Sequence, residues 1–147
     1  MSQQVERAAA AFKEGFSCSQ AVLAACAEEL GLDRETALRI SSGFGGGMGR
    51  LGEVCGAVSG AAMALGLKYG RTEAADVARR DRTYRLVKEL GERFRAQHGA
   101  ITCRELLGCD IGTPEGDRFA REQGRYKACP EFVRDAAAML EQMLEEA

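Results

Sequence analysis

Six cysteines are the residues of this 147-residue chain whose type and placement could support chemistry. Four of them stand where a helix is predicted to begin, beside a capping residue, a proline or a glycine-rich stretch: Cys18, Cys55, Cys103 and Cys129. Unpaired backbone amides and the positive end of the helix dipole stabilise a thiolate at such a position and lower its pKa below about 8.5. Because a thiolate is both a nucleophile and a metal ligand, these four cysteines are the predicted site, either as catalytic thiols or as metal ligands.

Long stretches of sequence separate the four cysteines, and none of them belongs to a local Cys-x-x-Cys motif. The standard signatures of zinc ribbons, thioredoxins and bacterial ferredoxins are therefore excluded, and a shared site would have to be assembled by the fold. The other two cysteines are different. Cys26 lies among alanines in the middle of a predicted helix and is interpreted as core. Cys109 follows a predicted helix end at Gly108 and is either a spare thiol near the site or without function.

Composition and charge limit the class of protein. With 46% hydrophobic and 29% charged residues, the chain has the composition of one globular domain rather than of a disordered segment. Its net charge of -2 provides no positive field to attract nucleic acid or an anionic membrane surface. No apolar run approaches the roughly 20 residues of a membrane helix, and the first residues lack the features of a signal peptide. We therefore expect a cytoplasmic protein, in a reducing compartment where permanent disulfides are rare.

Apolar residues recur at helical spacing along the chain, and no alternating run indicates a strand. The sequence therefore predicts an all-α fold, a compact single-domain bundle of about six to eight helices over residues 1–147. Capping residues, glycines and prolines place these helices at residues 3–14, 18–30, 34–40, 51–67, 73–97 and 103–107, with two more that open at residues 114 and 129. The longest helix is predicted to bury one stripe of residues: Val77, Tyr84, Val87, Leu90 and Phe94.

Glycine is concentrated in residues 41–49, directly before the predicted central helix at 51–67. This stretch is too rich in glycine to hold a helix and is predicted to be a loop. Its backbone N–H groups could donate to the sulfurs of a cofactor. Gly45, Gly46 and Gly47 are therefore the predicted cofactor-binding residues. Small residues recur four apart along one face of the central helix, at Gly56, Gly60 and Ala64. We expect another backbone to approach that face closely.

Five parts of the chain match a known family: GFSCSQAV at 15–22, FGGGM at 44–48, GEVCGAVSG at 52–60, CRELLG at 103–108, and the late Cys129. In these parts the chain resembles the C_GCAxxG_C_C family, over most of its length. The resemblance implies that Cys18, Cys55, Cys103 and Cys129 are the family's four cysteines, and that Cys26 and Cys109 match no motif position. That family is described as redox-active by inference from its cysteines and from neighbouring oxidoreductase and transporter functions. The resemblance therefore implies a redox partner protein, or a transporter or oxidoreductase system, as the partner.

Three functions are compatible with these residues. In the first, two cysteines alternate between dithiol and disulfide while the others assist or relay electrons. In the second, four thiolates bind a [2Fe–2S] cluster or a tetrahedral zinc ion. In the third, the chain is a helical scaffold or subunit without chemistry of its own. His98, the only histidine, is predicted at a helix C-terminus and is considered as a ligand or proton-transfer residue.

Cys55 is the cysteine that we expect to be least replaceable. It combines a predicted helix N-terminus with the glycine-rich stretch before it and the small residues Gly56 and Gly60 after it. These neighbours leave room for other elements to come near its sulfur. On this interpretation, Cys55 is the nucleophile or the essential ligand, and Cys26 is the buried control.

Overall fold

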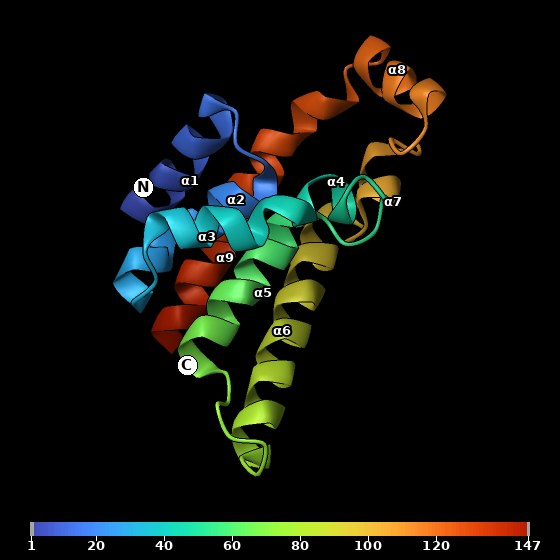
Figure 1. Ribbon diagram of the computed structural model, residues 1–147. Helices are drawn as coiled ribbons and strands as arrows, with labels where there is room; N and C mark the ends of the chain where they lie inside the picture. The colour runs from blue at the N-terminus through green and yellow to red at the C-terminus, as the bar shows by residue number, and fades with distance from the viewer. Residues whose placement is uncertain (1, 147) are drawn as a thin grey trace.

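The computed structural model describes residues 2–146, which fold into helices joined by turns (Figure 1). Within this range the α-helices are α1 (Gln3–Glu14), α2 (Cys18–Ala27), α3 (Arg34–Ser41), α4 (Gly45–Met48), α5 (Gly56–Tyr69), α6 (Val77–His98), α7 (Cys103–Leu107), α8 (Pro114–Glu122) and α9 (Cys129–Glu146). Three 3-10 turns accompany them, at Glu28–Leu30, Ser42–Phe44 and Arg125–Ala128. With the four-residue α4 set aside, eight α-helices remain, so the prediction of an all-α single-domain bundle is confirmed.

Helices α2 and α5 form the centre of the bundle. Both are apolar around most of their circumference, which is typical of a helix covered on every side. Helix α2 packs against α1, α3 and α5, and α9 closes the bundle by packing against α1, α5 and α6. Figure 1 shows α5 and α6 running side by side, with α9 on the other side of α5 and both chain ends on the same side of the molecule. None of the helices in residues 2–146 has the length and hydrophobicity that crossing a membrane requires.

The small-residue face of α5 is where α2 approaches most closely, as the sequence predicts. A Cβ atom at Gly60 would lie 2.6 Å from the carbonyl oxygen of Ser19, and one at Gly56 would lie 3.1 Å from the Ser19 backbone nitrogen. Only glycine leaves space for this contact. Ser19 itself is fully buried and donates its hydroxyl hydrogen to the carbonyl of Ser41 at 2.8 Å. The start of α2 is thus fixed against both α5 and the end of α3.

Two predicted helices begin later than the sequence suggests. The central helix begins at Gly56 instead of residue 51, since a turn at residues 51–52 is followed by residues 53–55, which pair in extended form with another segment. The long helix begins at Val77 instead of residue 73, because the Asp76 side chain caps it by accepting from the Arg79 N–H.

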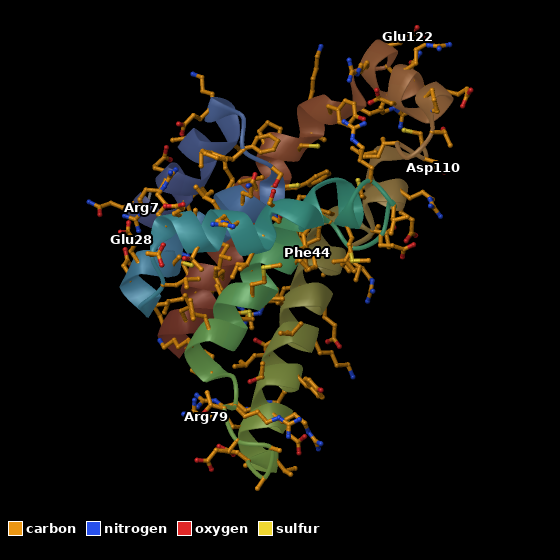
Figure 2. All side chains as sticks on the ribbon, in the orientation of Figure 1. Arg7, Glu28, Phe44, Arg79, Asp110 and Glu122 are labelled. Atoms are coloured by element: carbon orange, nitrogen blue, oxygen red, sulfur yellow. The ribbon has the colours of Figure 1, made fainter. Side chains whose placement is uncertain are left out.

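Part of the predicted buried stripe on α6 is also wrong. Tyr84 is 66% exposed and Val77 is 46% exposed, whereas Leu90 and Phe94 are fully buried. The cause is visible in Figure 2, where Arg79 marks an end of α6 that extends past the body of the bundle. The first turns of α6 have no third helix to cover them, so their apolar residues remain on the surface.

The glycine-rich stretch is more ordered than the predicted loop. Helix α3 continues to Ser41, a 3-10 turn follows, and α4 completes the connection. Within α4, Gly46 and Gly47 have left-handed φ angles of 66° and 69°, so this segment is a tight double turn rather than a regular helix. Two residues with side chains, Met48 and Arg50, also have positive φ angles, of 69° and 68°. Such a conformation is unfavourable for them and is maintained by the surrounding contacts.

Candidate functional site

A short antiparallel pairing of backbone segments 53–55 and 101–103 positions two of the predicted cysteines. The Cys55 N–H donates to the Ile101 carbonyl at 2.8 Å, and the Cys103 N–H donates to the Glu53 carbonyl at 2.7 Å. The Arg104 guanidinium reinforces the contact by donating to the Leu51 carbonyl at 2.9 Å. These bonds bring the N-termini of α5 and α7 together although many residues of sequence separate them.

All four predicted cysteines line one cavity of about 340 Å³, at the junction where α2, α4, α5, α7 and α9 meet. Phe44, labelled in Figure 2, lies close to this junction, at the turn that leads into α4. The remaining lining residues are mostly apolar or glycine: Phe12, Ser17, Gly45, Gly46, Gly47, Arg50, Gly56, Leu106, Leu107, Ile111, Tyr126 and Phe132. The fold therefore brings together four cysteines that are distant in the sequence.

Each of these cysteines lies at a helix start, but the four starts are not equivalent. Cys18 is the first residue of α2, behind a full capping box formed by Ser17 and Gln20. Cys55 occupies the cap position of α5, and Cys103 is the first residue of α7. Cys129 is the first residue of α9, yet a 3-10 turn precedes it and its own N–H already donates to the Tyr126 carbonyl. The helix terminus at Cys129 therefore has fewer free amides than the others.

The surroundings of Cys18 lower its pKa, as its place at a helix start predicts. Its pKa is lowered to about 6, chiefly by a hydrogen bond from the Cys55 thiol. Backbone N–H groups of Gly46, Cys18 and Ser19 add to this effect, and together they outweigh the cost of burying the charge. The start of α2 and the glycine turn thus supply the amide donors, and a second cysteine supplies an S–H donor.

The expectation of a lowered pKa is wrong for the other three cysteines. Donation to the Cys18 thiolate, together with burial, raises the pKa of Cys55 well above its ordinary value. Burial raises the pKa of Cys103 to about 11 and that of Cys129 to about 12, and the Cys18 charge raises both further. In these three positions desolvation is stronger than the stabilisation by helix amides.

The glycines of the turn and of α5 allow backbone to approach the sulfurs. A Cβ atom at Gly56 would lie 2.8 Å from the Cys18 sulfur, and one at Gly47 would lie 2.8 Å from the Cys103 Cβ atom. Gly46 donates its N–H to Cys18. All three predicted cofactor-binding glycines line the cavity. The Gly46 amide acts on a side chain of the protein itself, because it helps to lower the pKa of Cys18.

The side chains as placed do not form a metal site. Across residues 2–146, no three His, Cys, Asp or Glu side chains are grouped in a way that could hold a metal ion. Four thiolates around a zinc ion or a [2Fe–2S] cluster need such a grouping. The four cysteines thus share a cavity, but they are not grouped there as metal ligands.

The remaining cysteines and the histidine lie outside the lining of the cavity. Cys26 is buried in the main core, as predicted, and desolvation raises its pKa to about 11. Cys109 packs beside Cys103 in a smaller apolar cluster under α8. His98 stacks against Phe132, with ring centroids 4.9 Å apart, and its Nε2 atom lies 2.9 Å from an Asp135 carboxylate oxygen. His98 is therefore one layer behind the cavity wall.

Arg50 is not among the predicted site residues, although its place five positions before Cys55 predicts a positive charge near that cysteine. Among the described residues that line the cavity, it is the one charged side chain other than cysteine. Its Nη1 atom lies 3.5 Å from Asp117, which also accepts a 2.6 Å hydrogen bond from the Tyr126 hydroxyl. Donation from Tyr126 is the main reason that the pKa of Asp117 is lowered. Arg50 follows a run of glycines, but only the folded chain shows that its backbone turns left-handed and directs it to this place.

We expect the alkylation rate of Cys18 in the native protein to rise with a midpoint near pH 6, because that is the pKa of its thiol. The buried Cys26 should label only after unfolding. Quenched iodoacetamide labelling at a series of pH values, read by peptide mass spectrometry, measures both. A midpoint near the ordinary value of 9.0, or earlier labelling of Cys26, would contradict the hydrogen-bond arrangement at Cys18.

The chain is thus a single all-helical domain in which cysteines from four helix starts line one cavity. It belongs to the C_GCAxxG_C_C family, described as "Putative redox-active protein", which matches residues 16–143. Comparison with curated proteins and with solved structures gave no match. The family match confirms the resemblance drawn from the sequence.

Proposed function

We propose that the protein is a thiol–disulfide redox protein in which Cys18 and Cys55 alternate between dithiol and disulfide. The observation that carries the proposal is that Cys18 and Cys55 line the same cavity, where the Cys18 sulfur lies against Gly56, the residue that follows Cys55. The side chain of Cys55 is also the main cause of the lowered pKa of Cys18. A low-pKa thiolate beside a second, protonated thiol is the arrangement that thiol–disulfide exchange needs. The family's description as redox-active supports the same class of chemistry.

The exchange proceeds in two balanced steps with a partner disulfide. In the first, the Cys18 thiolate attacks one partner sulfur, the partner S–S bond breaks, and one partner thiolate leaves and takes up a proton. In the second, Cys55 loses its proton and attacks the Cys18 sulfur, which forms the Cys18–Cys55 disulfide and releases the second partner thiolate. Two electrons pass to the partner, whose two thiolates take up one proton from Cys55 and one from solvent, and the reverse sequence reduces the protein again.

Cys103 and Cys129 have supporting roles in this proposal. Both line the cavity, and the Cys18 charge acts on the pKa of each, so both lie within electrostatic reach of the reacting sulfur. Their raised pKa values keep them as thiols while Cys18 reacts. Either can attack Cys18 in a mixed disulfide when Cys55 is absent or already oxidised, which provides an alternative resolving thiol.

The proposal is tested by equilibrating the protein in oxidised and reduced dithiothreitol and mapping disulfides by mass spectrometry. We expect a two-electron transition and one dominant Cys18–Cys55 peptide, and the same result for the Cys26→Ala control. Anaerobic purification with metal analysis gives the competing outcome. Stoichiometric zinc, or iron with sulfide and a visible absorption band, would overturn the proposal in favour of a metal site. An absence of both disulfide and metal would favour the scaffold.

A further inference from the structure

The cavity has the size and lining of a small-molecule site. Its volume of about 340 Å³ lies in the range of ligand pockets, which are mostly apolar with a few placed polar groups. A water molecule in the liquid occupies roughly 30 Å³, so the cavity has room for on the order of ten groups of that size. Aromatic walls are provided by Phe12, Tyr126 and Phe132. A short organic molecule fits this space, whereas the folded part of a protein does not.

Arg50 gives this apolar cavity a single positive charge. Among the residues described, no Asp or Glu side chain belongs to the lining, so the thiolate of Cys18 is the only negative group there that opposes it. The Arg50 guanidinium is close enough to lower the pKa of Cys103, which shows that its charge acts inside the cavity. A ligand that carries an anionic group would therefore be attracted to the Arg50 side and away from the thiolate.

Asp117 does not cancel the charge of Arg50. Its carboxylate accepts from the Tyr126 hydroxyl at 2.6 Å and forms an ion pair with the Arg121 Nε atom at 3.2 Å, but its contact with Arg50 is longer, at 3.5 Å. Two guanidinium groups thus share one carboxylate. The Arg50 side chain is 56% exposed and keeps free N–H donors for a carboxylate, to which it can bind in a bidentate manner.

The backbone of Arg50 is fixed in an unfavourable left-handed conformation. Gly112 packs against the carbonyl oxygen of Arg50, and a Cβ atom at Gly112 would lie 2.6 Å from that oxygen. Gly46 packs against the side chain of Arg50. Held conformations of this kind are concentrated at binding and catalytic sites, where the surrounding contacts maintain them. The Arg50 side chain is therefore anchored at the cavity and does not move freely as part of a surface loop.

We propose that the substrate which exchanges with Cys18 is a small organic disulfide, or its thiol, that carries a carboxylate bound by Arg50. This inference rests on the proposed thiol–disulfide function and specifies its substrate class. The Cys18 thiolate attacks one sulfur of the bound disulfide, its S–S bond breaks, and the carboxylate-bearing thiolate leaves with a proton from solvent. Cys55 then resolves the mixed disulfide and releases the second thiol.

The test uses three small disulfides with similar chain lengths and different charges: 3,3′-dithiodipropionate, 2-hydroxyethyl disulfide and cystamine. The rate of each reaction with the reduced protein is divided by its rate with free 2-mercaptoethanol, which removes intrinsic reactivity. We expect the normalised rate of the anionic disulfide to exceed that of cystamine by about tenfold or more. Raising the ionic strength from about 0.05 M to about 0.5 M should reduce this preference by screening Arg50.

Arg50→Gln should lower the reaction rate with the anionic disulfide by about tenfold and change the rate with the neutral disulfide by less than about twofold. Arg50→Lys should keep most of the preference for the anionic disulfide. Arg85→Gln, on the exposed face of α6, is the matched loss of one arginine and should change nothing. The iodoacetamide rate of Cys18 reports whether Arg50→Gln leaves the site folded.

Equal normalised rates for the three disulfides, or faster reduction of a protein disulfide such as that of insulin, would overturn the substrate class alone. Failure of Cys18 to react with any disulfide would instead overturn the proposed function.

Discussion

Replacing Cys18 with serine is expected to slow disulfide formation at pH 7 by about tenfold or more. The three cavity thiols that remain stay protonated at that pH, because burial raises the pKa of Cys55, Cys103 and Cys129. Loss of the Cys18 charge lowers these pKa values in part, and the greater nucleophilicity of a more basic thiolate restores a further part of the rate. Stopped-flow oxidation with a small disulfide, followed by quantification of the remaining thiols, measures the rate. The variant should keep the helical circular dichroism of the wild type.

Two replacements of Cys55 separate its two roles. Cys55→Ser and Cys55→Ala both remove the resolving sulfur, so neither can form the Cys18–Cys55 disulfide. A serine hydroxyl can still donate to the Cys18 thiolate, and the alkylation midpoint should stay near pH 6, the pKa of Cys18. Alanine cannot donate, so the midpoint should move upward. An unchanged midpoint in Cys55→Ala would show that backbone amides alone stabilise the thiolate, and a fast pH 6 phase that survives in Cys18→Ser would assign the thiolate to another cysteine.

Gly60→Ala is expected to lower the free energy of unfolding by about 2–3 kcal/mol, because the added methyl group meets the backbone of α2. Its position would be 2.6 Å from the Ser19 carbonyl oxygen and 3.2 Å from the Ser19 Cα atom, neither of which can move without shifting the helix. Urea unfolding followed by circular dichroism gives the change.

Gly66→Ala is the matched control in the same helix. No heavy atom lies within 4 Å of its added Cβ position, so the better helix propensity of alanine should stabilise the protein by about 0.5–1 kcal/mol. If both variants are equally destabilised, the loss comes from the helix itself and the contact between α2 and α5 is looser than described.

Local signals in the sequence predict most of the fold. The capping residues Ser17, Asp33, Thr102 and Thr113 all accept from backbone amides where a helix begins. These signals work because a cap satisfies groups within a few residues of itself. The helices predicted to begin at residues 51 and 73 begin at residues 56 and 77 instead. In the first case the backbone before the helix pairs with a distant segment, and in the second a later residue caps the helix.

The chemistry of the site was predictable only in part. The sequence identifies Cys18, Cys55, Cys103 and Cys129, and the fold places all of them on one cavity. It does not reveal which of them is ionised, because that depends on the balance between amide donors and burial, and burial is set by other helices. It predicts the positive charge of Arg50 near Cys55 but not that Arg50 lines the cavity, since the left-handed turn that orients this residue depends on a contact more than sixty positions away, at Gly112.

The pairing of residues 53–55 with 101–103 has a consequence for the order of events during synthesis. A growing chain that has not yet produced residues 101–104 lacks the hydrogen-bond partners that hold Cys55 and the turn after Leu51. Closing so long a loop costs entropy that only the later helices can offset. Under the proposed function, Cys18 gains its neighbour Cys55 only when the fold is complete. The proposed nucleophile would then be activated late in synthesis.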